Sequence, residues 1–137
     1  MVMAIEVFNP DGLPKPDSYR QVAVASGSRL VFLAGQVARD ADGAQIGNGD
    51  LSAQSAQALR NVVIAVESVG GSFADVAKLT VYVVDWSLDK MSSIEAGFAR
   101  VSEELGIDTR KAMTMLGVVT LAEPDILVEI DAVAVLD

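Results

Sequence analysis

The clearest pattern of apolar and polar positions lies in the last 26 residues, Ala112–Asp137, where two apolar stretches flank a polar connection that contains Pro124. Proline cannot donate a backbone hydrogen bond to a neighbouring strand, so Pro124 is expected in the turn. In the second stretch, every other residue is apolar: Ile126, Val128, Ile130, Ala132, Ala134 and Leu136. Because strand side chains alternate between two faces, this face is predicted to pack against helices.

The opposite face of the same stretch carries Glu129 and Asp131 between apolar neighbours. Carboxylates are rarely buried completely without a partner. Two interpretations follow for this pair. Either the two carboxylates face solvent, or they line a cleft or subunit interface that holds Glu129.

Earlier apolar stretches predict further strands. Residues 3–8 are expected to form an edge strand, and Tyr19–Ala25 and Leu30–Val37 are expected to be joined by a tight turn at Ser26–Ser28. Leu30–Val37 is apolar on both faces, which favours a central place in a sheet. Gly35 interrupts it, and indicates with equal weight a bulge or a close approach of the backbone to a ligand.

Helical spacing of apolar residues predicts helices over Leu51–Val69 and Met91–Leu105. Asp50 or Ser52 is expected to cap the first helix, and Gly106 to end the second. The β-branched run Val76–Val84 between them predicts a strand. The resulting order β-β-α-β-α-β-β indicates an α+β fold with two helices packed on one face of a mixed sheet.

Composition limits the chemistry that this chain can perform. Its 137 residues suit a single domain spanning 1–137, and they include neither cysteine nor histidine. Disulfides, zinc sites of the usual kind and a Ser-His-Asp triad are therefore excluded, and no metal or cofactor is predicted. Acid-base work at neutral pH is left to carboxylates, lysine, tyrosine, backbone groups or water.

The net charge of -9 changes the expected partners. A strongly acidic surface without a basic stripe repels phosphate backbones, so no nucleic-acid partner is predicted. The same charge disfavours anionic membrane surfaces, and no apolar run approaches the length of a membrane span. With no signal-peptide pattern at its start, the sequence predicts a cytoplasmic protein.

Five stretches in register resemble the Rid family, the reactive intermediate deaminases also called the YjgF or endoribonuclease L-PSP family. They are NPDGLPKPDSYRQV, VFLAGQV, QALRNVV, GGSFADVAKLTVYVVD and LVEIDAVAV. The resemblance covers nearly the whole chain. It implies a chorismate-mutase-like fold, a homotrimer whose three sheets form a central barrel, and small-molecule clefts between neighbouring subunits.

The resemblance also implies a site and a reaction. Active members hydrolyse enamines and imines such as 2-aminoacrylate to 2-oxo acids and ammonia. By position, Glu129 corresponds to the glutamate that activates water, Tyr19 to the aromatic wall, and Gly35 with Gln36 to the cleft lining. Thr114 ends the stretch that corresponds to the family's P-A-R-[ST] motif, and here that stretch reads KAMT.

Two positions depart from the family pattern. Met113 stands where the substrate-binding arginine is usual, and Glu95 stands where active members often carry asparagine. A thioether cannot neutralise a substrate carboxylate as a bidentate guanidinium does. Arg110 or Lys111 could replace the missing cation, although a solvated pair ahead of a strand is favoured about three to one.

Three functions therefore remain open from the sequence. The first is an enamine or imine deaminase of a divergent subgroup. The second is a hydrolase or binding protein for a neutral or cationic small molecule. The third is a noncatalytic, regulatory homotrimer that keeps only the assembly, and in that case Glu129 would serve a structural role.

Overall fold

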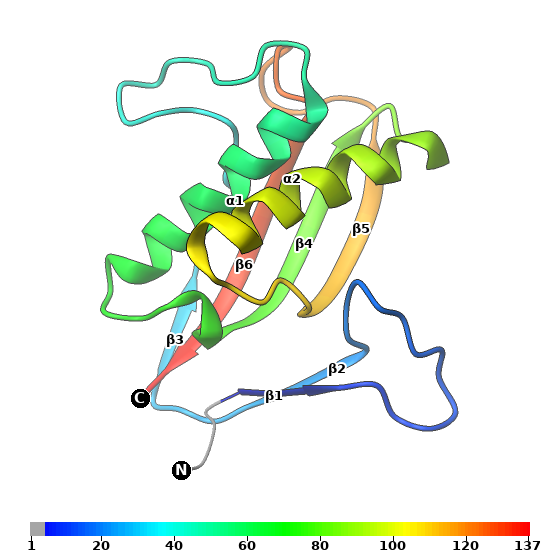
Figure 1. Cartoon of the computed structure of the whole chain (residues 1–137). Coiled ribbons are helices and arrows are strands. Elements are labelled where there is room, and N and C mark those ends of the chain that lie inside the picture. Colours follow the sequence, from blue (N-terminus) through cyan, green and yellow to red (C-terminus); the bar gives the residue numbers. More distant parts are fainter. Residues whose placement is uncertain (1–4) are drawn as a thin grey trace.

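Two helices cover one face of a four-stranded sheet, and a separate two-stranded ribbon crosses below it (Figure 1). The computed structural model describes residues 5–137. The strands are β1 (Ile5–Phe8), β2 (Val22–Ala25), β3 (Arg29–Phe32), β4 (Val76–Val84), β5 (Ala112–Val118) and β6 (Val128–Leu136). The helices are α1 (Leu51–Glu67) and α2 (Met91–Leu105), with the short 3₁₀ turns η1 (Phe73–Asp75) and η2 (Leu88–Lys90). The predicted α+β class is confirmed.

Both predicted helices form, and local chemistry explains their ends. Asp50 caps α1 by accepting a hydrogen bond from the backbone N–H of Ala53 at 3.0 Å, so Asp50 rather than Ser52 is the N-cap. The second helix ends at Gly106, whose φ of 64° is a left-handed conformation that glycine adopts at little cost. Across the described residues, no helix is both long and apolar enough to cross a membrane.

The main sheet has the order β3-β6-β4-β5, so the last strand of the chain lies inside it. Strand β6 pairs antiparallel with both β3 and β4, while β4 and β5 are parallel. The predicted strands after Arg110 both form, but they are not neighbours, because β4 lies between them. Pro124 lies in their connection, as predicted.

The core lies between this sheet and the two helices. The alternating apolar face of β6 is buried there, as predicted, and Ile130 has no exposed surface. Leu79, Val81 and Val83 of β4 are also fully buried and belong to the same core. Burial of this aliphatic face provides the main driving force for the fold.

The N-terminal strands differ from their prediction. Strand β2 pairs with β1 and β3 pairs with β6, so Ser26–Ser28 is a crossing between two sheets rather than a tight hairpin turn. A Cβ at Gly27 would lie 2.5 Å from the carbonyl oxygen of Leu136, so the crossing passes directly over the end of β6. Residues 3 and 4 of the predicted edge strand lie outside the described residues.

The prediction that Leu30–Val37 is a central strand is wrong for the sheet of a single chain. The strand ends at Phe32 and forms the edge of the sheet, and Leu30 and Phe32 are 63% and 72% exposed. An apolar pattern on both faces of a strand predicts that both faces are buried, but this chain covers only one of them. The other apolar face of the strand is left open.

Candidate functional site

The sheet register divides the predicted site residues between its two faces. Glu129 lies opposite Tyr82 and Asp131 lies opposite Thr80, all on the face that carries no helix, which we call the open face. Thr114 lies beside Thr80 on β5 and therefore shares that face. Met113 lies beside the fully buried Leu79 and packs against the core on the helix side.

Met113 and Glu129 therefore lie on opposite faces of one chain, and a cleft that holds both would have to join residues of two subunits. The physical reason is the two-residue period of a strand, because a shift of one position moves a side chain to the other face. Thr114 is the residue of the KAMT stretch that shares a face with Glu129. Within one chain, Met113 matches the arginine position of the motif but not the face of Glu129.

Around Glu129, the open face is built by a backbone irregularity. Phe32 lies opposite Val133 and Gln36 lies opposite Ile130, so four steps along one strand match three along the other. This count is that of a β-bulge, which re-aims the chain locally. Gln36 is held to Ile130 by two backbone hydrogen bonds of 2.7 and 2.9 Å. The bulge predicted at Gly35 is therefore present.

Gly35 also allows a close approach. The Glu129 carboxylate lies against its Cα, and a Cβ there would come 2.5 Å from Glu129 Cδ and 2.8 Å from Cγ. Any other residue would push the carboxylate away. Glu129 is half-buried on the open face, with Gly35 and the backbone of Gln36 as its border.

Further polar contacts organise the rest of the open face. The Tyr82 hydroxyl donates to Asp131 at 2.9 Å, and this hydrogen bond, with burial and the charges of Asp131 and Glu129, raises the pKa of Tyr82. The Lys78 ammonium donates to the Thr114 hydroxyl at 2.7 Å. Tyr82 and Lys78 were not singled out from the sequence. Lys78, Thr80 and Tyr82 alternate along the Val76–Val84 run, and this two-residue period is the sequence pattern that places them on one face of the strand.

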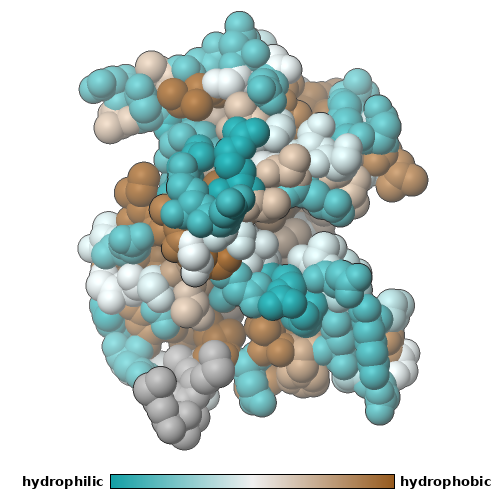
Figure 2. Space-filling view, in the orientation of Figure 1, coloured by the Kyte–Doolittle hydropathy of each residue, from teal (hydrophilic) through white to brown (hydrophobic). Residues whose placement is uncertain are grey.

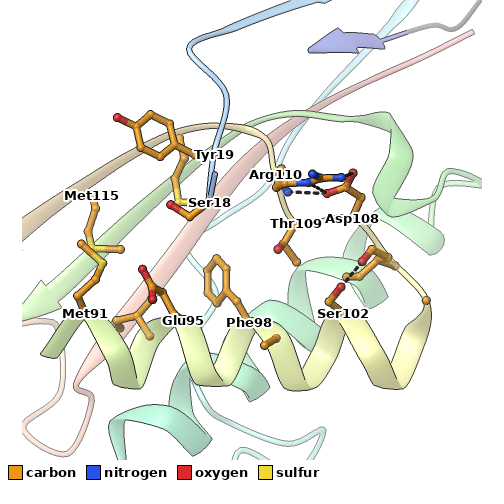
Figure 3. A pocket seen from close by; sticks show the side chains of 15 residues that line it. Ser18, Tyr19, Met91, Glu95, Phe98, Ser102, Asp108, Thr109, Arg110 and Met115 are labelled. Carbon is orange, nitrogen blue, oxygen red and sulfur yellow. Dashed lines mark hydrogen bonds and ion pairs between the residues drawn. The ribbon is translucent and has the colours of Figure 1, made fainter. Parts of the chain in front are cut away.

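The other three predicted site residues meet in a pocket on the helix side. Tyr19, Glu95 and Met113 line a cavity of about 880 Å³ between α2, the start of β5 and the N-terminal loop. Glu95 and Phe98 rise from α2 toward Tyr19 and Met115 (Figure 3). The surface is hollowed between the helices and the N-terminal segment that contains β1 and β2 (Figure 2). Apolar side chains dominate the wall, with Met91, Ile94, Phe98, Met113 and Met115 among them.

The cation in this helix-side pocket is already engaged. Arg110 holds Asp108 with two side-chain hydrogen bonds of 2.9 Å, drawn as dashed lines in Figure 3. These hydrogen bonds lower the pKa of Asp108 to about 2 and raise that of Arg110. Lys111 is buried behind the pocket. The predicted solvated pair is thus wrong for Lys111, and Arg110 is exposed but paired.

Comparisons with known proteins agree with this fold. The sequence pattern of the family described as Endoribonuclease L-PSP matches residues 13–136. The RutC family protein PH0854 of Pyrococcus horikoshii is 34% identical over 94% of this chain and 96% of its own length.

Two solved structures are similar over nearly the full chain. The Rid family protein YyfB of Yersinia pestis, of unknown function, superposes with a TM-score of 0.86 at 33% identity, covering 98% of this chain and all of that one. The structure of E. coli TdcF with bound serine superposes with a TM-score of 0.68 at 29% identity, covering 97% and 98% of the two chains.

Proposed function

This chain belongs to the endoribonuclease L-PSP family, which includes the Rid and YjgF proteins, and we propose that it is a homotrimeric small-molecule hydrolase. Its reaction would be the hydrolysis of a reactive enamine or imine, in a cleft formed between two subunits. The bound serine of TdcF, a relative 29% identical, supports a ligand of amino-acid size.

One observation carries the proposal: a single chain keeps the predicted site residues in two separate places. Glu129 and Gly35 lie on the open face, whereas Tyr19, Glu95 and Met113 line the helix-side pocket. A second copy seated on the open face would bring its own pocket residues toward Glu129. The exposed Leu30 and Phe32 of β3 supply an apolar surface for such a copy.

Glu129 would act as the general base of the reaction. Its carboxylate takes a proton from water as the water oxygen attacks the imine carbon, and the nitrogen accepts a proton. The carbinolamine then expels ammonia and becomes the carbonyl product. Gly35 contributes by letting the carboxylate lie close to the backbone.

The charges of the helix-side pocket favour a substrate without a carboxylate. Arg110 beside this pocket is paired with Asp108, whereas Lys78 on the open face donates to the neutral Thr114 hydroxyl and keeps its charge. Glu95 adds a negative charge to the pocket wall. Neutral or cationic imines are therefore preferred over 2-aminoacrylate, which needs a guanidinium partner.

The test compares ammonia release from 2-aminoacrylate, generated by a coupled dehydratase, with release from an imine that lacks a carboxylate. We expect turnover of the second substrate, and at least a hundredfold loss in Glu129→Gln if Glu129 is the general base. Ligand binding without turnover of either substrate would favour the regulatory alternative. A stable monomer by light scattering at micromolar concentration would reject the inter-subunit cleft.

A matched pair of variants tests which face of the sheet must carry the guanidinium that binds a substrate carboxylate. Thr114→Arg places a guanidinium on the face of Glu129, whereas Met113→Arg places it on the helix side. Because a second copy would bring its own helix-side pocket toward Glu129, activity on 2-aminoacrylate should rise in Met113→Arg and stay low in Thr114→Arg. Glu95 lines the same pocket and can bind the new guanidinium, so Met113→Arg with Glu95→Asn is the fairer test. A gain confined to Thr114→Arg would contradict the meeting of the pocket and Glu129 across subunits.

A nucleic-acid partner is not part of this proposal, because a net charge of -9 opposes phosphate binding. The expected result is weak RNA binding at physiological salt. Submicromolar, salt-sensitive RNA binding that follows the protein through purification would contradict it.

A further inference from the structure

Lys111 is the one charged side chain that is buried among residues 5–137, with 7% of its surface exposed. Its Nζ lies 5.0 Å from the centre of the Phe73 ring. None of the ion pairs in the described part of the chain includes it. A buried lysine without a carboxylate partner is costly to keep charged, so its position calls for a chemical reason.

The side chain borders its own cavity of about 360 Å³, on the far side of the α2–β5 connection from Tyr19 and Glu95. The two cavities share residues 106–108 and Arg110 as a common wall. The apolar part of the lining comes from β1, from η1 and from the α2–β5 connection: Ile5, Val7, Phe73, Ala74 and Ile107. A neutral apolar molecule fits these walls best.

The backbone of Lys111 is fixed from both sides. Its carbonyl oxygen accepts a hydrogen bond from the N–H of Arg20 at 3.0 Å, and its N–H donates to the carbonyl of Thr109 at 3.0 Å. The amine therefore projects from a rigid position at the start of β5. A fixed amine in a small cavity loses little conformational freedom when it reacts.

The surroundings favour the neutral amine. Burial lowers the pKa of Lys111, while the negative charges of Asp108 and Asp75 oppose that effect. Arg110 also lines the cavity, but its guanidinium is bound to Asp108. In the described residues, this cavity has no free guanidinium to bind a carboxylate, so an anionic ligand is disfavoured.

We propose that Lys111 is a covalent binding site for small apolar aldehydes, separate from the cleft of Glu129. The Nζ lone pair adds to the carbonyl carbon, and the carbonyl oxygen takes up a proton to give a carbinolamine. The remaining amine proton and the hydroxyl group then leave as water, and an imine remains. The reaction is reversible and needs no further reactant.

The probe is benzaldehyde with sodium cyanoborohydride, which reduces the imine to a stable secondary amine that peptide mass spectrometry can map. The chain has four lysines, and two of them serve as internal controls: Lys15, which pairs with Asp11 at the surface, and the half-buried Lys90, which donates to the backbone carbonyls of Val84 and Asp85. At pH 7 we expect labelling at Lys111 at least about fivefold faster than at either control. The rate at Lys111 should saturate with benzaldehyde concentration, since a cavity binds the aldehyde first.

Lys111→Arg keeps the apolar stem but cannot form an imine, so only the fast labelling at position 111 should be lost. Lys15→Arg, the matched control, should lose only its own slow labelling. If Lys111→Arg fails to fold, Phe73→Leu in a protein that retains Lys111 should weaken saturation by opening the cavity wall. Labelling of Lys111 that is no faster than at Lys15, or that rises linearly with benzaldehyde, overturns the proposal.

Discussion

The two faces of the main sheet are made by the same strands, but they differ in burial and in the polarity of their side chains. On the helix side, Leu79, Val81 and Ile130 are fully buried under α1 and α2. On the open face, the residues between them are Tyr82, Glu129 and Asp131, which remain half-buried. One face therefore completes the core of a single chain, while the other holds polar groups that no other element of the chain covers.

The largest contrast should appear in stability. Leu79→Ala opens a cavity in the helix-side core and should lower the free energy of unfolding by about 2–5 kcal/mol. Leu30→Ala, on the exposed side of β3, should change it by less than about 0.5 kcal/mol for an isolated chain. Denaturant unfolding at several protein concentrations measures both. A loss of stability in Leu30→Ala that depends on protein concentration would place that side chain in a subunit contact.

A smaller but more local effect is expected at Gly35. Gly35→Ala would force the Glu129 side chain aside, and because this half-buried side chain can move, the change should cost at most about 1 kcal/mol of stability. The double variant Gly35→Ala with Glu129→Ala removes the clashing atoms, so most of that cost should disappear. A double-mutant cycle by chemical denaturation tests this coupling. Additive effects would show that the two residues do not touch.

The hydrogen bond between Tyr82 and Asp131 should contribute about 1 kcal/mol, so Tyr82→Phe should destabilise by that amount. Because the folded-state pKa of Tyr82 is raised, this contribution is fully present below pH 10 and is lost as pH rises through the folded pKa. Unfolding midpoints measured from pH 8 upward should converge for the two proteins. A constant difference at all pH values would contradict the role of the phenol proton.

The smallest effect belongs to the helix-side pocket, at the exposed pair of Asp108 and Arg110. The pKa of Asp108 is lowered from 3.8 to about 2, so its contribution is present above pH 3.8 and is lost as pH falls toward 2. Asp108→Asn should therefore reduce the acid dependence of stability in that window and nowhere else. NMR titration of the Asp108 carboxyl carbon gives a direct check, and an ordinary midpoint would refute the pairing.

Much of the fold was predictable because its signals are local. The alternation in β6 and the helical spacing in α1 and α2 each report burial within a few residues, and the caps at Asp50 and Gly106 are local chemistry. Strand partners are not local. Nothing in Leu30–Val37 indicates that the strand pairs with a segment about a hundred residues later, or that it lies at the sheet edge.

The positions of the candidate site residues along the chain could be read from the sequence, but their grouping in space could not. Matching KAMT to the family motif put Met113 at the arginine position, but it did not show that Met113 and Thr114 lie on opposite faces of β5. The burial of Lys111 also escaped prediction, because a lysine before a strand is usually solvated. Only the packing of β1 and η1 around its side chain encloses it.

The inner position of β6 has a consequence for how the protein acquires its structure. Its hydrogen bonds join residue pairs such as Arg29 and Leu136, so the sheet cannot close until the C-terminal strand has left the ribosome. Until then β3 and β4 each lack a neighbour, and both present unpaired strand edges. Such distant pairings slow folding, because the entropic cost of closing long loops comes before the stabilising strand contacts can form. The nascent chain is therefore exposed to aggregation until β6 has been made and has paired with β3 and β4.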